Sequence, residues 1–550
     1  MIGGALVMSE SQGIREPGNQ GIGESTKQRI SESAKPPSGT QIHATSRGSV
    51  FSKLKSSGVA SVNLRPGWLL VAACVVVGLA AGALAAATSP LLALAVPVAL
   101  VGGLVLLSDL QMSLLALIGV AYLLPMAAIP LRLGFNPTLL DIVLLAFFFV
   151  WFVRLAVGAK HSLDDEVPAT YELANASEAP SCPPFREVRH DGASSPLLNG
   201  LVLVFIGLAC TSFFLSTGVT QDILRRFAEI VLVLFFYFGV VNTVRSRQLL
   251  ERLVAAIILA AAAAAIIGLV LYFLPHDLAN RLLNTLRILN YPTGWVLRFI
   301  NNDQALAQRA IATSVDPNVL GGVLAMAAAL TTGQLFSARP VLRRALLLPA
   351  WGVMLLCLLL TYSRGSWIGL AAGLVLIATL KERRLWVLFL AIGVVVLFLP
   401  QAEAFLGHLS AGVQIQDRAT QMRLGEYKDA FKLIAQFPWF GIGFAAAPVI
   451  DLYRGVSSVY LLIAEEMGLL GLGAYLAIMA VFFWQGLRGL GRLGDEGLRS
   501  ILVGLLAAVL SALVAGVLDH HFLDINFPHV AALFWLNLGL GVATLRVAES

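Results

Sequence analysis

Arginines stand in the polar stretches that interrupt the long apolar segments of this chain, an unusual place for so many guanidinium groups. The set comprises Arg225, Arg226, Arg298, Arg309, Arg364, Arg418, Arg423 and Arg454. Guanidinium groups match phosphate oxygens in bidentate geometry and stay charged when partly buried. The set therefore predicts a phosphate-bearing substrate. For any single arginine the alternative is pairing with a phospholipid headgroup or with Asp277, Asp303 or Asp451.

Two of these arginines have informative neighbours. Arg364 lies in Thr361-Tyr362-Ser363-Arg364-Gly365, where two apolar segments meet with almost no loop between them. A charge at this depth is expensive unless it is paired or faces a wet cavity, which makes Arg364 a predicted site residue; snorkelling is the alternative. Arg309 precedes Asp316-Pro317-Asn318. Asp316 and Pro317 are ordinary helix-start residues, and the same helix N-terminus, with Asn318, could also receive an anion.

Carboxylates and histidines offer acid–base chemistry at two other places. The segment Asp519-His520-His521-Phe522-Leu523-Asp524 indicates a proton acceptor, a metal ligand or polar capping of two helix ends. His and Cys residues show no metal-site spacing, and we expect no metal. Glu465 and Glu466 stand a few turns inside an apolar segment, where a carboxylate faces either a cavity or a partner such as an arginine.

Residues 401–457 form the longest polar interruption in the second half of the chain. The residues that recur there at helical spacing, and predict one face of a short amphipathic helix, are Arg423, Tyr427, Ala430, Phe431 and Ile434. Pro438, Gly441 and Gly443 are expected to end this helix and turn the chain. Long loops are often functional, so we expect this one to carry part of the site.

Membrane-spanning helices must position these residues. The 550 residues are 58% hydrophobic and 13% charged, with a mean hydropathy of +0.81, and a bilayer solvates so much apolar surface. We predict an all-α polytopic integral membrane protein with about 12–14 transmembrane helices and one large extracytoplasmic loop. The expected spans are residues 67–88, 90–107, 112–130, 138–157, 197–216, 227–243, 252–275, 317–336, 345–361, 366–380, 385–400, 458–484, 500–518 and 528–545.

The orientation follows from short basic tracts between the spans. Residues 1–66 are polar and basic, and we expect a disordered cytoplasmic tail that precedes a membrane domain over 67–550. Successive spans cross the bilayer in opposite directions, so the connecting segments alternate between the two sides. This alternation assigns to the inside both termini, the insertion 158–196 and the basic tracts near 245–252, 339–344, 381–384 and 488–499. It places 217–226, 276–316, 362–365, 401–457 and 519–527 outside. This pattern accounts for the net charge of +6 without nucleic-acid binding.

Four motifs occur in order between residues 309 and 535. They are Asp316-Pro317-Asn318 with the glycines that follow, Thr361 to Gly365, Arg423 through Pro438-x-x-Gly441-x-Gly443, and Tyr460-Leu461 followed by Glu466-x-Gly468-Leu469-x-Gly471. Together they resemble the O-antigen ligase and O-antigen polymerase family of bacterial envelope glycan enzymes. The resemblance implies a polytopic helical body with one large extracytoplasmic loop. It also implies that a glycan passes from a polyprenyl diphosphate carrier to an acceptor, with no nucleotide sugar and no cofactor.

The resemblance makes Arg364 and Arg423 diphosphate-facing residues, and it aligns Arg225 or Arg226 with an arginine before a span in the earlier half. Ligases of this family typically place a histidine just before the span that follows the loop. Here residues 455–460 contain none. This departure favours a polymerase over a ligase and leaves Glu466, His520 and His521 as alternative bases.

We therefore predict a glycan polymerase or ligase in the bacterial cytoplasmic (inner) membrane, acting at its outer face in exopolysaccharide, capsule or O-antigen synthesis. Its expected partners are a polyprenyl-diphosphate-linked glycan donor, a glycan or lipid acceptor, the bilayer and other polysaccharide assembly proteins. The predicted catalytic residues are Arg364, Arg423, Glu466, His520 and His521. The predicted substrate-binding residues are Arg225, Arg226, Arg309, Asn318, Arg418 and Tyr427.

Two other classes of protein stay open. A secondary transporter or flippase for an anionic or lipid-linked substrate would also use charges inside the membrane, but near the midplane and often between two related halves. A non-catalytic assembly partner of an envelope complex would keep its function without Arg364.

Overall fold

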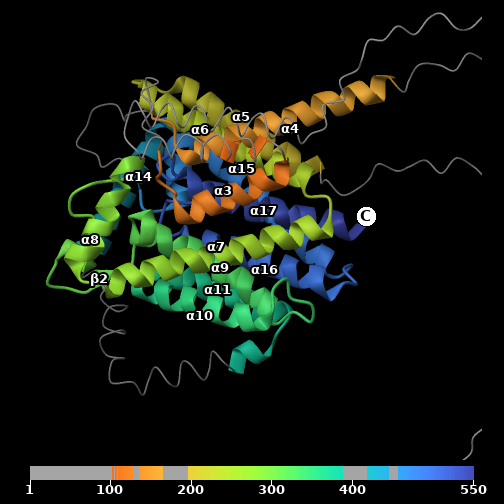
Figure 1. Ribbon diagram of the computed structural model, residues 1–550. Helices are drawn as coiled ribbons and strands as arrows, with labels where there is room; N and C mark the ends of the chain where they lie inside the picture. The colour runs from red at the N-terminus through yellow and green to blue at the C-terminus, as the bar shows by residue number, and fades with distance from the viewer. Residues whose placement is uncertain are drawn as a thin grey trace, which may run out of the picture. The chain divides into compact units, whose positions relative to one another are not determined.

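The computed structural model describes residues 102–103, 106–107, 109–128, 136–164, 196–387, 418–444 and 456–549 (Figure 1). All of them belong to one unit of the chain, Ala73–Ser550. The expected tail 1–66, most of the insertion 158–196, the span 67–88 and most of the spans 90–107 and 385–400 lie outside the described residues. The total number of spans therefore stays a prediction.

The described residues form helices almost throughout. In the first half these are α3 (Leu110–Leu123), α4 (Leu139–Asp164), α5 (Pro196–Leu215), α6 (Gln221–Thr243), α7 (Arg247–Phe273) and α8 (His276–Thr285). Short elements follow: the 3₁₀ helices η1 (Leu286–Leu289), η2 (Ile300–Asn302) and η3 (Ala312–Ser314), and the antiparallel strands β1 (Arg298–Phe299) and β2 (Gln308–Arg309). The second half contains α9 (Pro317–Leu335), α10 (Arg344–Leu360), α11 (Arg364–Leu380), α14 (Arg418–Gln436), α15 (Val459–Leu490), α16 (Glu496–Ala515) and α17 (Pro528–Glu549).

Membrane-spanning helices dominate this set. Among the described residues, 7 helices are long and apolar enough to cross a bilayer, and they are α4, α5, α7, α9, α15, α16 and α17. Three shorter apolar helices are α3, α10 and α11. Each expected span from 112–130 to 528–545, apart from 385–400, coincides with a helix. The prediction of an all-α polytopic membrane protein is confirmed.

Helix α9 lies at the centre of the bundle and packs against α7, α10, α11 and α16. Small residues allow this close packing. A Cβ atom on Gly333 of α9 would lie 2.8 Å from Cα of Gly504 in α16, and one on Gly369 of α11 would lie 2.4 Å from the carbonyl oxygen of Ser511. These contacts hold α11 along α16 and α9, which places Arg364, the first residue of α11, near the beginning of α9.

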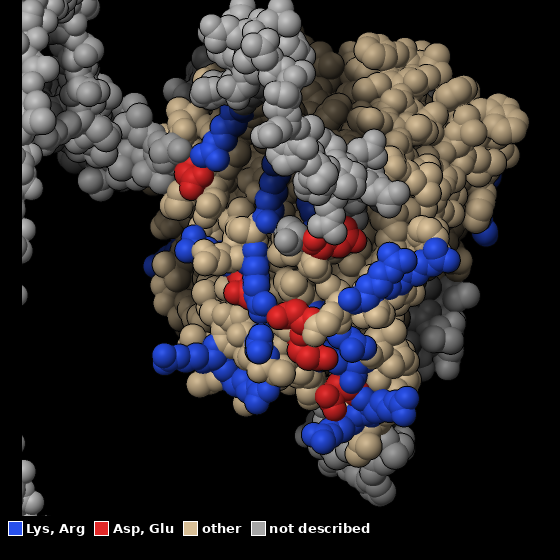
Figure 2. Space-filling view, turned by 90° about the vertical axis from the view of Figure 1, so that its right-hand side faces the viewer, with Lys and Arg blue, Asp and Glu red and all other residues tan. Residues whose placement is uncertain are grey.

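Backbone contacts assign the connecting segments to two ends of the bundle. At one end, which we call the loop end, Ala310 donates to the carbonyl of Leu360 at 2.8 Å, and Val459 donates to the carbonyl of Gly516 at 2.8 Å. The labels α8, α14 and β2 mark this end in Figure 1. At the opposite end Arg247 pairs with Asp495 at 2.8 Å, and Lys and Arg side chains gather there in Figure 2. The described parts of the segments predicted to lie outside thus share one end, and which end faces the cytoplasm stays a prediction.

The amphipathic helix expected in the long loop is α14. It ends at Gln436, just before Pro438, as predicted. On this helix Ala430 is buried, whereas Phe431 is 60% exposed. Leu433 completes the buried side instead, because Phe431 points about 100° around the helix from Ala430.

Candidate active site

Arg309 occupies the centre of the loop end. Its Nε donates to the carbonyl oxygen of Thr361 at 2.7 Å, and its Nη2 donates to Oδ1 of Asn318 at 2.6 Å. Asn318 is itself placed by Asp316, whose Oδ1 accepts from the backbone N–H groups of Asn318 and Val319 and so caps α9. The guanidinium therefore ties the beginning of α9 to the end of α10.

Arg364 and Arg423 lie near enough to Arg309 for their charges to lower its pKa. Arg364 begins α11 and Arg423 lies on α14, and both are half-buried. Burial, together with the charges of Arg423 and Arg364, lowers the pKa of Arg309 to about 10, against the opposing effect of Asp316 and Asp519. Arg309 stays charged at neutral pH. We call these three residues the arginine cluster, and its concentration of guanidinium groups suits an anion with more than one phosphoryl group.

The backbone around Arg309 is strained. Ala312 (φ 46°) and Val315 (φ 62°), between Arg309 and α9, and Tyr362 (φ 52°), next to the carbonyl that Arg309 binds, all have positive φ. This conformation is uncommon for residues other than glycine and is an outlier for a β-branched residue. Such strain persists only where the surroundings enforce it, and it concentrates at functional sites.

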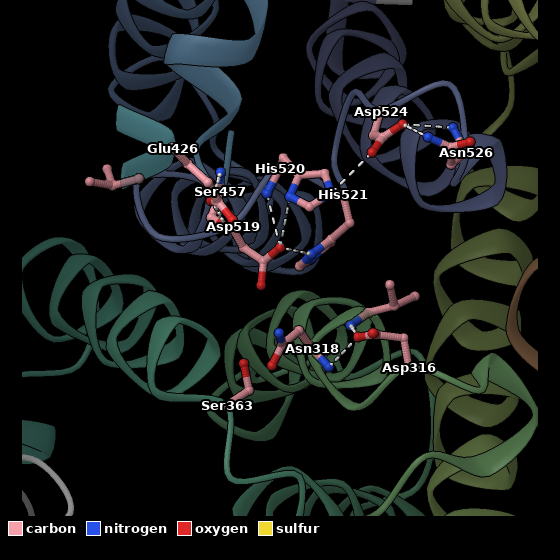
Figure 3. Close-up of polar contacts among 12 residues, drawn as sticks. Asp316, Asn318, Ser363, Glu426, Ser457, Asp519, His520, His521, Asp524 and Asn526 are labelled. Atoms are coloured by element: carbon pink, nitrogen blue, oxygen red, sulfur yellow. Dashed lines mark hydrogen bonds and ion pairs between the residues drawn. The ribbon is translucent and has the colours of Figure 1, made fainter. Parts of the chain in front are cut away.

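The connection between α16 and α17 supplies a chain of histidines and carboxylates (Figure 3). Oδ1 of Asp519 lies 2.9 Å from Nδ1 of His521 and 3.7 Å from Nδ1 of His520, and Nε2 of His520 lies 3.0 Å from Oδ2 of Asp524. Burial alone would raise the pKa of Asp519, but His521, His520 and Arg423 lower it below its usual range. Asp519 is therefore a carboxylate that links the arginine cluster to both histidines.

The two histidines differ in what they can do. The side chain of His521 is 1% exposed, and its Nε2 packs on Gly322, where an added Cβ would lie 2.3 Å away. The side chain of His520 is 29% exposed, whereas its Nδ1 is buried and makes no hydrogen bond to any described residue. His520 is thus the better placed base of the two.

Helix α14 is fastened to the beginning of α15. Ser457 donates to Oε2 of Glu426 from its backbone N at 3.0 Å and from Oγ at 2.7 Å. The hydroxyl of Tyr427 donates to the carbonyl oxygens of Ser457 at 3.2 Å and Val517 at 3.3 Å. Because Arg423, Glu426 and Tyr427 are three and four residues apart on one helix face, these contacts turn Arg423 toward the other arginines.

The glycine motifs form a break in α15. Gly468 has non-helical backbone angles inside α15 (φ 69°), and Gly441 and Gly443 also have positive φ. The carbonyls released around the break accept from Ile442 (to Glu465, 2.8 Å) and Gly443 (to Glu466, 3.0 Å). The side chains of Glu465 and Glu466 are buried beside the break and line a pocket together with Arg226.

The remaining predicted residues lie away from Arg309 or have side chains outside the described residues. Arg225 pairs with Asp141 at 2.9 Å and lies 3.8 Å from Glu229, in a network between α4 and α6. Arg226 pairs with Asp222 at 2.9 Å and donates to Asn526 at 2.5 Å. Arg418 begins α14, but its side chain lies outside the described residues. Arg225 thus pairs with carboxylates of α4 and α6, and its role in substrate binding stays a prediction.

Glu426 belongs to the candidate site through its contacts with Ser457, and it was not predicted from the sequence. The available signal was its position three residues after Arg423 on an amphipathic helix, but nothing in the sequence shows that Ser457 lies opposite. Within the part of the chain that the structure describes, no group of three or more His, Cys, Asp and Glu residues is placed to hold a metal ion.

Comparison with known families agrees with the motif resemblance. Residues 350–476 match the sequence model of the family described as O-antigen ligase. The match includes Arg364, Arg423 and Glu466, but it ends before His520 and begins after Arg309. A search of curated proteins found no match. The chain is thus a multi-pass membrane protein in which residues 350–476 are similar to the O-antigen ligase family.

Proposed function

We propose that the protein transfers a glycan from a polyprenyl diphosphate carrier to a sugar hydroxyl at the outer face of the bacterial cytoplasmic membrane. The observation that carries this proposal is the arginine cluster, in which Arg364 and Arg423 come within electrostatic reach of the half-buried Arg309. Glycan transfer is the chemistry that the matched O-antigen ligase family implies. A diphosphate on a lipid provides the anion that such a cluster would bind.

The reaction that we propose is a displacement at the anomeric carbon. The acceptor hydroxyl oxygen forms a bond to that carbon, and the bond from the carbon to the diphosphate oxygen breaks. The electron pair of the broken bond leaves with the polyprenyl diphosphate, and the hydroxyl proton passes to the imidazole of His520. Arg309, Arg364 and Arg423 would offset the charge that develops on the leaving group, as preorganised electrostatic stabilisers do.

His520 is our choice of base over His521 and Glu466. Ligases of the family place a histidine just before the span after the loop, where residues 455–460 of this chain contain none. The backbone N of Val459, at the beginning of that span, donates to the carbonyl of Asp519 at 3.1 Å. His520, the residue after Asp519, therefore lies close to the beginning of the span that a ligase histidine would precede.

Between polymerase and ligase we favour the polymerase, because the sequence lacks the ligase histidine. A transporter or flippase is a less suitable alternative, since the candidate side chains gather at one end of the bundle. Transporter sites lie near the midplane.

The test uses purified protein in detergent, a polyprenyl-diphosphate-linked oligosaccharide and no nucleotide. Wild type is compared with Arg364→Ala, Arg423→Ala and the control Arg298→Ala, which removes an exposed arginine at the same end. Longer lipid-linked glycan from wild type and Arg298→Ala, but not from the other variants, is expected of a polymerase. Transfer only to a different acceptor lipid or glycan would indicate a ligase.

Two outcomes would reject the enzyme. If wild type leaves the donor intact with all acceptors while proteoliposomes move it across the bilayer, the protein is a flippase. If cells carrying Arg364→Ala still make the polysaccharide at the wild-type level, the protein is an assembly partner without a catalytic role.

A further inference from the structure

A polar pocket opens beside the break in α15. Its volume is about 320 Å³, within the range of roughly 300–1,000 Å³ that is usual for small-molecule sites. The polar residues that line it are Asp222, Arg226, Glu465, Glu466, Asp524 and Asn526. They come from three separate parts of the chain, namely α6, α15 and the connection between α16 and α17.

We propose that this pocket binds the acceptor sugar of the transfer reaction, an inference that rests on the proposed function. Carboxylates accept hydrogen bonds from hydroxyl groups, while a guanidinium and an amide donate them, so the wall offers both kinds of partner to a polyhydroxylated ring. Phe444 adds an apolar surface to the same wall. Four carboxylates would repel a diphosphate, which has its own site at the arginine cluster. Charge therefore separates the acceptor from the donor.

One histidine joins the two sites. Asp524 belongs to the pocket wall and lies 3.0 Å from Nε2 of His520. On the other side of the imidazole, Nδ1 lies 3.7 Å from Oδ1 of Asp519. The charge of Arg423 is one of the causes that lower the pKa of Asp519. Figure 3 shows Asp524 and Asn526 on one side of the histidines and Glu426 and Ser457 on the other. A sugar in the pocket would present its hydroxyl beside Asp524, on the Nε2 side of His520, and the donor would approach from the arginine side.

The wall of the pocket is held rigidly. Glu465 and Glu466 lie just before the break at Gly468, and their carbonyls are held by Ile442, Gly443 and Ser212. Non-helical backbone inside a membrane domain is tolerated where it is buried in protein or lines a wet cavity. Across the pocket Arg226 is fixed by Asp222 and Asn526. A preformed wall of this kind lowers the entropy that ordering would otherwise cost on binding.

The experiment measures KM for each substrate separately. The acceptor probe is the free oligosaccharide released from the same lipid-linked donor. Ile223→Trp fills the pocket from its α6 wall, and the matched control Leu224→Trp adds the same ring at an exposed neighbouring position outside it. We expect Ile223→Trp to raise KM for the oligosaccharide at least about tenfold and to change KM for the donor less than about twofold. Leu224→Trp should match wild type for both substrates.

A second variant covers the case in which Ile223→Trp does not fold, as judged by size-exclusion chromatography. Glu465→Gln keeps the size of the side chain, and we expect the same selective rise in KM for the oligosaccharide. If the variant that folds has a wild-type KM for the oligosaccharide, or if KM rises for the donor instead, the pocket is not the acceptor site. Failure of wild type to elongate the oligosaccharide would also overturn this inference. Failure of wild type to consume the donor with any acceptor would instead reject the proposed function.

Discussion

Nε2 of His520 lies 3.0 Å from Oδ2 of Asp524. A carboxylate from the pocket wall thus contacts the proposed base directly. Burial alone would lower the pKa of His520, but the hydrogen bond with Asp524 and the charges of Asp519, Asp524 and Glu426 raise it above the usual 6.5. A general base must be neutral to accept a proton. We therefore expect kcat/KM to rise with pH as His520 deprotonates, with an acidic limb above pH 6.5.

Replacing Asp524 should move this acidic limb. Asp524→Asn removes a carboxylate that raises the pKa of His520, so the limb is expected to shift to lower pH. Asp429→Asn is the control, because Asp429 pairs with Lys432 at 2.9 Å. The measurement is the pH dependence of kcat/KM for each variant. An acidic limb at the same pH in Asp524→Asn would mean that another group is the titrating base.

The two histidines should respond differently to substitution. His520→Gln is expected to lower kcat by roughly 10²–10⁴-fold, the usual contribution of a general base. His521→Gln alters a fully buried ring against Gly322, and we expect mainly a lower apparent unfolding temperature. Turnover and thermal unfolding in detergent distinguish the two variants. If His521→Gln folds normally and loses turnover while His520→Gln keeps it, the base is His521.

Replacing Arg309 even with lysine should lower the activity. Arg309→Lys keeps the charge but cannot reproduce both the hydrogen bond to Thr361 and the one to Asn318. We expect a loss of roughly 10²–10³-fold in kcat, as when one preorganised donor is removed from an active site. Arg298→Lys, at an exposed position, should match wild type. Equal activity of both variants would show that charge alone is needed at position 309.

The glycine motif after α14 should be intolerant of a side chain. Gly441 has φ +69°, and an added Cβ would lie 2.4 Å from the carbonyl oxygen of Glu465. Gly441→Ala is therefore expected to cost about 1–3 kcal/mol and to lower the apparent unfolding temperature. Gly425→Ala is the matched control, because a Cβ at Gly425 in α14 has open space around it and alanine favours a helix by up to about 1 kcal/mol. Equal unfolding temperatures would contradict this role of Gly441.

The sequence alone determined the class of fold and the short motifs of the site. A bilayer requires long apolar helices, so the spans could be located from hydropathy. The prolines and glycines around residues 438–443 predicted where α14 would end, because their effect on the backbone is local. Arg364 could be chosen because a charge at a membrane boundary is costly unless it is paired or faces a wet cavity. Arg423 was indicated by the motif resemblance, and the matched family segment contains both.

Only the tertiary structure decided which polar residues act together. Arg225 and Arg226 are adjacent in sequence, yet one pairs with Asp141 and the other with Asp222 and Asn526. Glu426 meets Ser457 across 31 positions of chain, and no helical period predicts that contact. Which side chains meet depends on which helices pack together and at what rotation. Small residues such as Gly333 and Gly504 set that packing through contacts between distant segments.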